Sequence, residues 1–532
     1  MNKVVKVITY DVGTTGIKTC LYQIDSELKL IDAEMADYPL YILENGGAEQ
    51  DPMDWWGAMC TTTRQLIKKT AVNPGDISGI SFCSQMQGLV LVDREGAPLR
   101  RAMTYMDQRA HCEMQEQMGR GIKIGGINIF KLITSIRETG AVNASVKDPV
   151  WKYKWVEKNE PQTFEQVYKW LDVKEFLICR CTGEFIMTED SAFAALLYNI
   201  HQKKWSRRVC RMLGVKMSHL PEIVKSTDQV GGLNEKAASD LGLVEGTPVF
   251  GGGGDAALIG VGAGSVSTGD THIYTGTSGW VSTVVEKPLL DITSMIAAIV
   301  GAEPGKYNYF AEMETAGKCL EWVRDNIALD SVGCYRENSS VFNDPEKSRI
   351  GIYNYLTTIA GEVPAGSGGL IFTPWLHGNR CPFEDPCARG IFFNLNLETT
   401  KKELIRAVLE GVCFHLRWML EAQDRKVPTG RIIRFVGGGA LSDVTGQILA
   451  DITGREIETV ENPQNVGAVG AAVITGLGLG IIESFSAAKE MICPGKKFIP
   501  SPQNKEVYDK NFIVFKNLYK SNKGNFQALG RK

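Results

Sequence analysis

Two aspartates stand where a carboxylate could act on a phosphoryl group. Asp255 follows four glycines at 251–254, which let the backbone crowd a ligand while one carboxylate is presented at the end of a strand-like run. This placement suits a general base, although the N-cap of the following helix is the structural alternative. Asp11 ends the first apolar run of the chain. A carboxylate beside a polyphosphate repels it unless a cation intervenes, so Asp11 favours a bridging Mg²⁺, with a turn-initiating residue as its alternative.

The same short turn, rich in glycine and hydroxyl groups, occurs twice. Gly13-Thr14-Thr15-Gly16 and Gly276-Thr277-Ser278-Gly279 each lie between two strand-like runs. Backbone N–H groups and hydroxyls in such turns can surround phosphate oxygens without a formal positive charge. One copy alone commonly just connects two strands, but repetition at long separation predicts two related halves. The pattern favours a nucleotide held between these halves.

A third glycine-rich turn, Gly437-Gly438-Gly439-Ala440, follows the strand-like run 432–436. Its glycines would let a planar base or a ribose approach the backbone, and Ser442 and Gln447 lie near the start of the next helix. We therefore expect adenosine here, with a simple tight connection as the alternative.

Polar side chains in the first half could form a sugar pocket. Gln85-Met86-Gln87-Gly88 and Tyr105-Met106-Asp107-Gln108-Arg109 follow strand-like segments and offer amide, carboxylate and guanidinium groups. The alternative is that such residues are solvated or pair with one another. The predicted substrate-binding residues are Gln85, Met86, Gln87, Tyr105, Asp107, Arg109 and Ala256.

The elements that must position these residues alternate between strands and helices, an α/β pattern. Expected strands are 4–10, 17–22, 77–84, 90–93, 247–250, 271–274, 280–285 and 432–436, and expected helices are 55–69, 401–421 and 442–453. The 532-residue chain exceeds the size of a single core, so we expect two domains with a junction near 266–270. The stretch 330–349 and the tail from 496 look peripheral to any chemistry.

Composition narrows the class of partner. The net charge of −3 is dispersed, which argues against a nucleic-acid or membrane partner and for a small molecule. The thirteen cysteines show neither zinc nor disulfide spacing, which fits a reducing compartment. Residues 1–3 run directly into a strand that the first turn needs, so we expect no signal peptide and a cytoplasmic protein. Five glycines interrupt the apolar run 466–482, which favours a buried helix over a membrane span.

The motifs, in this order and spacing, resemble those of the FGGY carbohydrate kinases of the actin-like ATPase superfamily, and within it the xylulokinases. The similarity spans 4–480. Residues 11–16 resemble the first phosphate motif of the family, 276–279 the second, and 437–440 the adenosine motif. Further matches are Glu49-Gln50-Asp51-Pro52 with Trp55-Trp56, Thr182-Gly183-Glu184, Ala407-Val408-Leu409-Glu410-Gly411 and Asn465-Val466-Gly467-Ala468.

The resemblance implies two ribonuclease-H-like domains with an interdomain cleft. Residues 1–267 would bind the sugar and hold the catalytic base, 268–484 would bind ATP, and 485–532 would form a C-terminal extension. Family members are often dimers, so the resemblance allows a homodimer without fixing the assembly.

The resemblance also assigns roles to residues. Asp255 falls on the catalytic base, which takes the proton of a sugar hydroxyl as that oxygen attacks the γ-phosphorus of ATP. Mg²⁺ is the implied metal, with Asp11 and Asp255 as its binding residues. The predicted ATP-binding residues are Gly13, Thr14, Thr15, Lys18, Thr275, Gly276, Thr277, Ser278, Gly437, Gly438, Gly439, Ala440 and Ser442.

Departures from the xylulokinase pattern fall mostly at the predicted sugar-binding positions. Gln87 replaces a usual His, Tyr105 a usual Trp, and Ala256 a usual Asn, while 378–382 departs from Gly-Glu-Arg-Thr-Pro. Polar pockets discriminate strongly, so these changes bear on specificity more than on the reaction. D-xylulose is the leading substrate, and another ketopentose, polyol, deoxy sugar or sugar acid is the runner-up. A sugar- and ATP-responsive regulatory protein without turnover is the alternative from another class.

Overall fold

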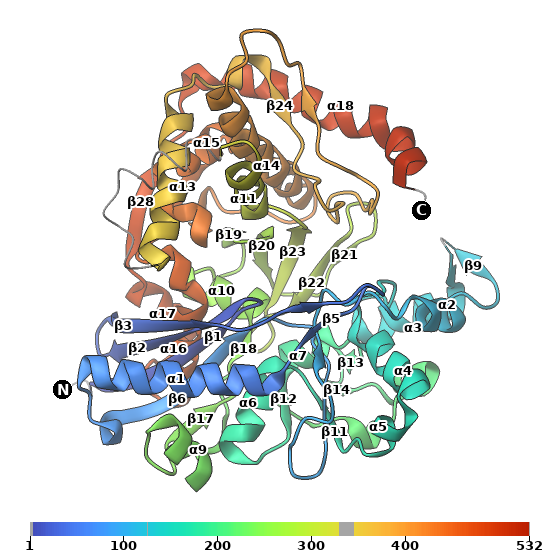
Figure 1. Cartoon of the computed structure of the whole chain (residues 1–532), viewed down its shortest axis with the longest axis vertical. Helices are drawn as coiled ribbons and strands as arrows, with labels where there is room; N and C mark the ends of the chain where they lie inside the picture. Colours follow the sequence, from blue (N-terminus) through green and yellow to red (C-terminus); the bar gives the residue numbers. More distant parts are fainter. Residues whose placement is uncertain (1–3, 125, 329–344, 531–532) are drawn as a thin grey trace.

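The computed structural model describes residues 4–124, 126–328 and 345–530, and two large sheets dominate it (Figure 1). The first has the strand order β16-β17-β6-β1-β2-β3, with β18 paired to β6. Its strands are β1 (Val5–Val12), β2 (Gly16–Ile24), β3 (Leu28–Asp37), β6 (Ile77–Ser84), β16 (Gln229–Gly232), β17 (Pro248–Phe250) and β18 (Gly253–Gly254). The second has the order β21-β22-β23-β20-β19-β26-β27-β28. Its strands are β19 (Thr271–Thr275), β20 (Gly279–Val285), β21 (Leu290–Asp291), β22 (Ile296–Val300), β23 (Tyr307–Met313), β26 (Ile432–Val436), β27 (Glu456–Val460) and β28 (Pro494–Phe498).

The two sheets repeat one topology. β1 pairs antiparallel with β2 and parallel with β6, and β19 pairs antiparallel with β20 and parallel with β26. A third antiparallel strand follows on one side, β3 or β23. On the other side a second parallel strand and an antiparallel strand follow, β17 and β16 or β27 and β28. The prediction of two related halves in an α/β fold is therefore confirmed, and each glycine-rich phosphate turn joins the first two strands of its sheet.

Helix α1 (Pro52–Thr70) packs against β2 and β3 of the first sheet. Its buried face includes Trp55, Met59 and Leu66, whose spacing matches the period of a helix. Asp51 caps the helix by accepting a hydrogen bond from the amide of Met53 at 2.9 Å. The helix expected from Trp55 therefore begins one turn earlier, at Pro52, which suits a first helical position.

Two helices pack with their backbones in contact between the sheets, α10 (Asp255–Gly262) and α16 (Val466–Gly478). A Cβ added to Gly262 would lie 1.9 Å from the carbonyl oxygen of Val466, and one added to Gly470 would lie 2.3 Å from that of Leu258. α16 also packs against β1, β2 and β6, although it comes late in the chain. The buried helix expected over 466–482 is confirmed, and its glycines serve close approach.

We expect Gly262→Val to lower the free energy of unfolding by about 3 kcal/mol or more, because the new side chain must push α10 away from the backbone of α16. Denaturant unfolding measures this. Gly57→Ala is the matched control, since a Cβ at Gly57 in helix α1 meets nothing within 4 Å and should change stability by about 1 kcal/mol at most, in the stabilising direction. Equal stability of the Gly262 variant and the wild type would contradict close packing of α10 on α16.

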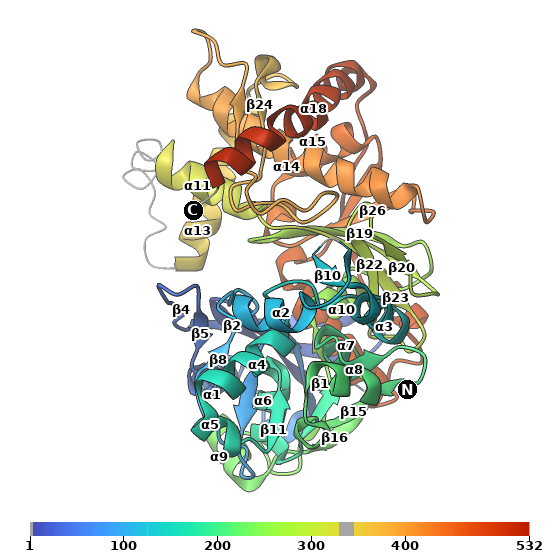
Figure 2. The ribbon, with the colours of Figure 1, turned by 90° about the vertical axis from the view of Figure 1, so that its right-hand side faces the viewer.

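The second sheet is covered by helices from the last third of the chain (Figure 2). α14 (Lys401–Asp424) packs against β20 and β23 and starts with a capping box formed by Thr400 and Glu403. α15 (Asp443–Thr453) and the C-terminal α18 (Lys505–Gly530) pack beside it, and Tyr519 of α18 stacks on Phe383 with ring centroids 3.5 Å apart. The predicted extension 485–532 thus supplies strand β28 and helix α18 to the second sheet and its aromatic core.

Further helices are α2 (His111–Met118), α3 (Ile129–Thr139), α4 (Pro149–Asn159), α5 (Pro161–Glu165), α6 (Val173–Thr182), α7 (Glu189–Ala194), α8 (Arg207–Leu213), α9 (Glu235–Leu241), α11 (Gly317–Asn326), α13 (Pro345–Gly361) and α17 (Phe485–Met491). Among these helices, α11 and α13 pack on α14 over the second sheet, and the others lie on the first half of the fold or beside α16. Most of the stretch 330–349 lies outside the described residues. Within the described ranges, none of the helices combines the length and hydropathy that a membrane span requires.

Candidate active site

Asp255 is the first residue of α10, at the end of the short strand β18. The N-cap is Gly254, so the alternative reading of Asp255 as the cap is wrong. The amide of Gly254 donates to Oδ2 of the buried Asp190 at 2.6 Å, and a Cβ at Gly254 would lie 2.1 Å from Sδ of Met86. The glycine thus brings Met86 of the predicted sugar loop against the backbone beside Asp255. Asp255 Oδ1 accepts from the amide of Ala256 at 2.8 Å.

The surroundings of Asp255 favour its neutral form. Burial raises the pKa of this carboxyl to about 7, opposed by the hydrogen bond from Ala256 and reinforced by the negative charges of Glu312, Asp11 and Asp172. A pKa near neutrality is what a general base needs in order to be ionised and still accept a proton readily.

Asp11 is near the end of strand β1, and its carboxylate lies beside the first turn of helix α16. Burial raises its pKa, and Lys18 and a hydrogen bond with Cys83 oppose that rise. A Cβ on Gly467 would come within 2.8 Å of Oδ2 of Asp11, so only glycine lets the first turn of α16 approach this carboxylate. Lys18, opposite Asp11 in the β1–β2 hairpin, donates to Oδ1 of Asn465 at 2.7 Å. This hydrogen bond links the strand after the first phosphate turn to the start of helix α16, more than four hundred residues later in the chain.

Each of the two phosphate turns is closed by one backbone hydrogen bond, which spans four residues in the first turn and three in the second. The amide of Gly13 donates to the carbonyl of Gly16, and that of Gly276 donates to the carbonyl of Ser278, both at 2.9 Å. The tips of the turns are exposed at Thr15 and Thr277. These exposed hydroxyls and backbone groups are available to phosphate oxygens, as the sequence predicts.

The glycine-rich turn after β26 lies directly on the second phosphate turn. A Cβ on Gly439 would lie 2.1 Å from Oγ1 of Thr275, and one on Gly437 would lie 2.6 Å from the carbonyl oxygen of the same threonine. Among the described residues, the buried Thr275 hydroxyl has no hydrogen-bond partner. Contact between these turns is what a single ATP site requires. Ser442 instead caps α15, accepting from the amide of Thr445 at 3.2 Å, so its side chain is already engaged.

The predicted sugar loop is tied to the first phosphate turn by side-chain amides. Nε2 of Gln85 donates to Oε1 of Gln50, and Nε2 of Gln50 donates to the carbonyl of Thr14, both at 2.8 Å. The Thr14 hydroxyl donates to that of Tyr105 at 3.3 Å. Gln87 has a left-handed backbone with φ of 63°, and its carbonyl accepts from Nζ of the buried Lys152 at 2.7 Å. Gln85, Gln87 and Tyr105 are therefore brought together with the phosphate turn.

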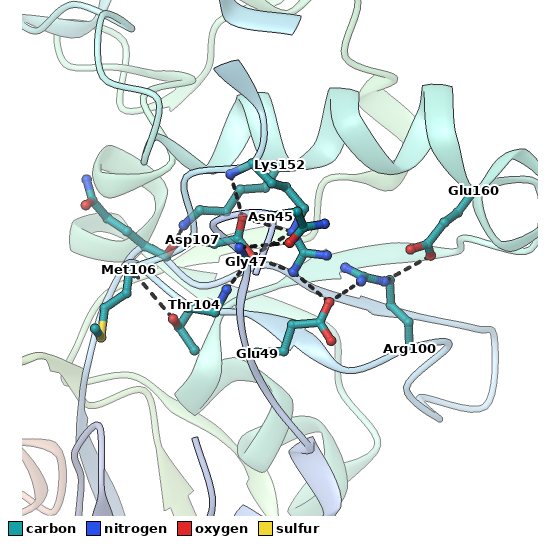
Figure 3. Close-up of polar contacts among 12 residues, drawn as sticks. Asn45, Gly47, Glu49, Arg100, Thr104, Met106, Asp107, Lys152 and Glu160 are labelled. Carbon is teal, nitrogen blue, oxygen red and sulfur yellow. Dashed lines mark hydrogen bonds and ion pairs between the residues drawn. The ribbon is translucent and has the colours of Figure 1, made fainter. Parts of the chain in front are cut away.

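Asp107 and Arg109 form an ion pair that also includes Glu49. Figure 3 shows Asp107 and Glu49 within this cluster of polar contacts. Nη2 of Arg109 lies 2.6 Å from Oδ2 of Asp107 and 2.7 Å from Oε1 of Glu49, and the guanidinium stacks over Trp155. Asp107 also accepts from the amide of Ala48 at 2.9 Å. This pairing is the alternative stated for such polar residues, and a role of Asp107 and Arg109 in sugar binding stays a prediction.

Several residues around the site carry no local sequence signal for a role there. Gln50 belongs to a motif shared with the family. No sequence pattern indicates a role for Lys152, Asp190 or Glu312. Each reaches the site from a distant segment, so neither spacing nor composition could have identified it.

The residues fit a magnesium nucleotide. In the described part of the chain, no group of three or more His, Cys, Asp or Glu side chains forms a metal cage. Mg²⁺ is commonly held by one or two carboxylates together with phosphate oxygens and water, so a dedicated cage is not required. The pKa of Asp255 is raised mainly by burial, and the charge of Asp11 adds to that rise, so a cation near both carboxylates would relieve this repulsion.

We expect kcat/KM to rise with pH and to level off above about 7, because only the ionised form of Asp255 can accept a proton and its pKa is about 7. Below that value the rate should fall about tenfold per pH unit. An unperturbed aspartate would give a flat profile over pH 5 to 8. Asp148→Asn is the matched control, since burial also raises the pKa of Asp148 to about 7. This variant should keep the acid limb of the profile, which is the fall in kcat/KM below about pH 7. If Asp148→Asn lost the fall in kcat/KM at low pH, that fall would be due to Asp148 and not to Asp255.

Known proteins share both halves of this architecture. The N-terminal domain of the FGGY family of carbohydrate kinases matches residues 6–262, and the C-terminal domain of that family matches 272–479. A xylulose kinase of Bacillus subtilis is 30% identical over 527 residues, covering 98% of each chain. A gluconokinase of the same organism is 28% identical, covering 96% of this chain and 94% of the relative.

Solved structures agree with the sequence comparisons. A ligand-bound xylulose kinase from Lactobacillus acidophilus superposes with a TM-score of 0.84 at 26% identity, covering 98% of this chain and 99% of that one. A gluconate kinase from the same species superposes with a TM-score of 0.83 at 25% identity, covering 99% of this chain and 100% of that one. Relatives with two different substrate names are thus similar over nearly the whole chain. With both family domains present in order and a full-length relative at 30% identity, the chain belongs to the FGGY family of carbohydrate kinases.

Proposed function

We propose that the protein transfers the γ-phosphoryl group of ATP to a hydroxyl of a small sugar, with D-xylulose as the leading substrate and Asp255 as the general base. The observation that carries this proposal is a partly exposed carboxylate with a pKa of about 7, adjoining both the predicted sugar loop and Asp11. The xylulose kinase relatives support the substrate, and the gluconokinase relatives support a sugar acid as the second candidate.

In this mechanism the sugar hydroxyl gives its proton to Asp255 while its oxygen forms the new bond to the γ-phosphorus. The bond from that phosphorus to the β,γ-bridging oxygen breaks, and ADP leaves. N–H groups and hydroxyls of residues 13–15 and 276–278 stabilise the phosphate oxygens. Mg²⁺, held through Asp11 and Asp255, supplies neutralisation of phosphate charge when bound. The turn 437–440 supports the adenosine.

A regulatory protein that binds both ligands without turnover is disfavoured by the same carboxylate. A carboxylate whose pKa is raised by its surroundings to about 7 opposes folding when ionised, and such perturbed groups gather at functional sites. Both phosphate turns also keep their closing hydrogen bonds.

The test is release of ADP from Mg-ATP in the presence of ketopentoses, other ketoses, polyols, deoxy sugars and sugar acids, with a control lacking sugar. Strong stimulation by D-xylulose, with D-xylulose 5-phosphate as product, is expected. Stimulation by another sugar would keep the kinase and reassign its substrate. Binding of ATP without stimulation by any sugar would favour the regulatory protein.

A further inference from the structure

Resting on the proposed function, we propose that Tyr274 is a further catalytic residue, whose hydroxyl donates a hydrogen bond to an oxygen of the γ-phosphoryl group during its transfer. Tyr274 directly precedes Thr275 and Gly276, two of the predicted ATP-binding residues, but no motif gives the tyrosine itself a role.

Tyr274 occupies in the second half of the chain the place that Asp11 occupies in the first. Each lies on the first strand of its hairpin, β1 or β19, two positions before the first glycine of the phosphate turn, Gly13 or Gly276. Both side chains approach the layer between the sheets. Asp11 lies beside Gly467 of α16, and Tyr274 packs against the buried cluster that α10 and α16 form. The repeated topology therefore directs both side chains to one region.

The phenol of Tyr274 lies in the field of the carboxylates of the first half. Burial raises its pKa above the usual value, and the negative charges of Asp11 and Asp255 reinforce this rise. The hydroxyl therefore stays protonated at neutral pH and can donate. With two carboxylates on the opposite side, a neutral donor can hold a phosphoryl oxygen without adding negative charge.

The hydroxyl lies against the second phosphate turn. A Cβ on Gly276 would lie 2.3 Å from the hydroxyl oxygen of Tyr274, so only glycine leaves room for the phenol there. In the described ranges, no group donates to this hydroxyl or accepts from it, and the side chain is partly exposed. The base Asp255 must lie beside the γ-phosphoryl group during transfer, and the phenol lies in the field of that base, which favours this group over the other two.

The ring of Tyr274 is fixed by its neighbours. It stacks on Trp280, its cross-strand partner, with ring centroids 4.0 Å apart and an interplanar angle of 19°. Nε1 of Trp280 donates to Nε2 of the buried His272 at 3.1 Å. A Cβ on Gly437 would lie 2.9 Å from the tyrosine ring, so the adenosine turn closes its other side. A donor held in this way loses little freedom when it binds.

The variant Tyr274→Phe tests the hydroxyl, because it keeps the ring and its stacking on Trp280. The kcat of sugar-stimulated ADP release from Mg-ATP should fall by about 100-fold, as is usual when one donor to a transition state is lost. The affinity for ADP, measured by calorimetric titration, should change by about twofold at most, because ADP has no γ-phosphoryl group. A loosened phosphate turn would instead weaken ADP binding together with kcat.

Tyr309→Phe is the matched control. Tyr309 lies on β23 of the same sheet, and its hydroxyl is buried in the core without a partner in the described part of the chain. Its loss should leave kcat unchanged.

The outcomes separate the inference from the kinase assignment. An active wild type with near-normal kcat in folded Tyr274→Phe, or with ADP affinity falling in parallel with kcat, would overturn the role of Tyr274 and leave the kinase intact. Absence of sugar-stimulated ADP release from the wild type would overturn the kinase assignment and the role of Tyr274 with it.

Discussion

Asp255→Asn is expected to lower kcat by about 10²- to 10⁴-fold, the range usual for loss of a general base. An amide has the shape of the carboxylate but cannot take the hydroxyl proton. The affinities for sugar and for ATP should survive, because most of the groups that bind them lie elsewhere in the site. Initial rates give kcat, and calorimetric titration gives the two affinities.

A folding defect is separable from this loss of chemistry. The pKa of Asp255 is higher in the folded protein than the ordinary value of about 3.8, so ionisation above pH 7 opposes folding at this site. The Asn variant carries no such charge and should melt at or above the temperature of the wild type at pH 8. Near-normal turnover in a folded Asp255→Asn protein would refute Asp255 as the base.

Asp11→Asn is expected to lower kcat/KM by about 100-fold and to raise the Mg²⁺ concentration needed for half-maximal rate, because misplacing the nucleotide phosphates weakens alignment of the reacting atoms. The pH profile gives a second readout. Asp11 raises the pKa of Asp255, so its neutralisation should move the acid limb to lower pH.

Asp25→Asn is the matched control for this change. Asp25 follows the far end of strand β2, away from the phosphate turn, and its carboxylate is engaged by the amide of Glu27 and by Gln23. It should keep the wild-type response to Mg²⁺. An unaltered Mg²⁺ response in Asp11→Asn would remove Asp11 from the metal site.

Local patterns predicted much of the fold and the positions of the glycine-rich turns, whose binding of phosphate stays a prediction. The strand over 432–436 is found with the expected limits, and 77–84 likewise, since each is a short apolar run bounded by turn residues. The phosphate turns and Asp255 were also predictable, because glycines beside strands carry a strong local signal.

Contacts between distant segments could not be predicted in the same way. The bond from Lys18 to Asn465 and the chain from Gln85 through Gln50 to Thr14 depend on tertiary packing. Tertiary packing also determines that Asp107 and Arg109 pair with each other. A polar cluster has the same sequence pattern whether its side chains face a ligand or one another. No sequence pattern predicted that aromatic residues of α18 complete the core over the second sheet.

The position of α16 has a consequence for synthesis of the protein. Strands β1, β2 and β6 are made within the first 84 residues, but the helix that packs on them begins only at Val466. A nascent chain therefore holds one apolar face of its first sheet uncovered until α16, which begins at Val466, has been made. Such a face invites association with other chains or with holding chaperones. The first half is thus expected to be a dependent folding unit on the ribosome, stabilised only once the end of the chain has emerged.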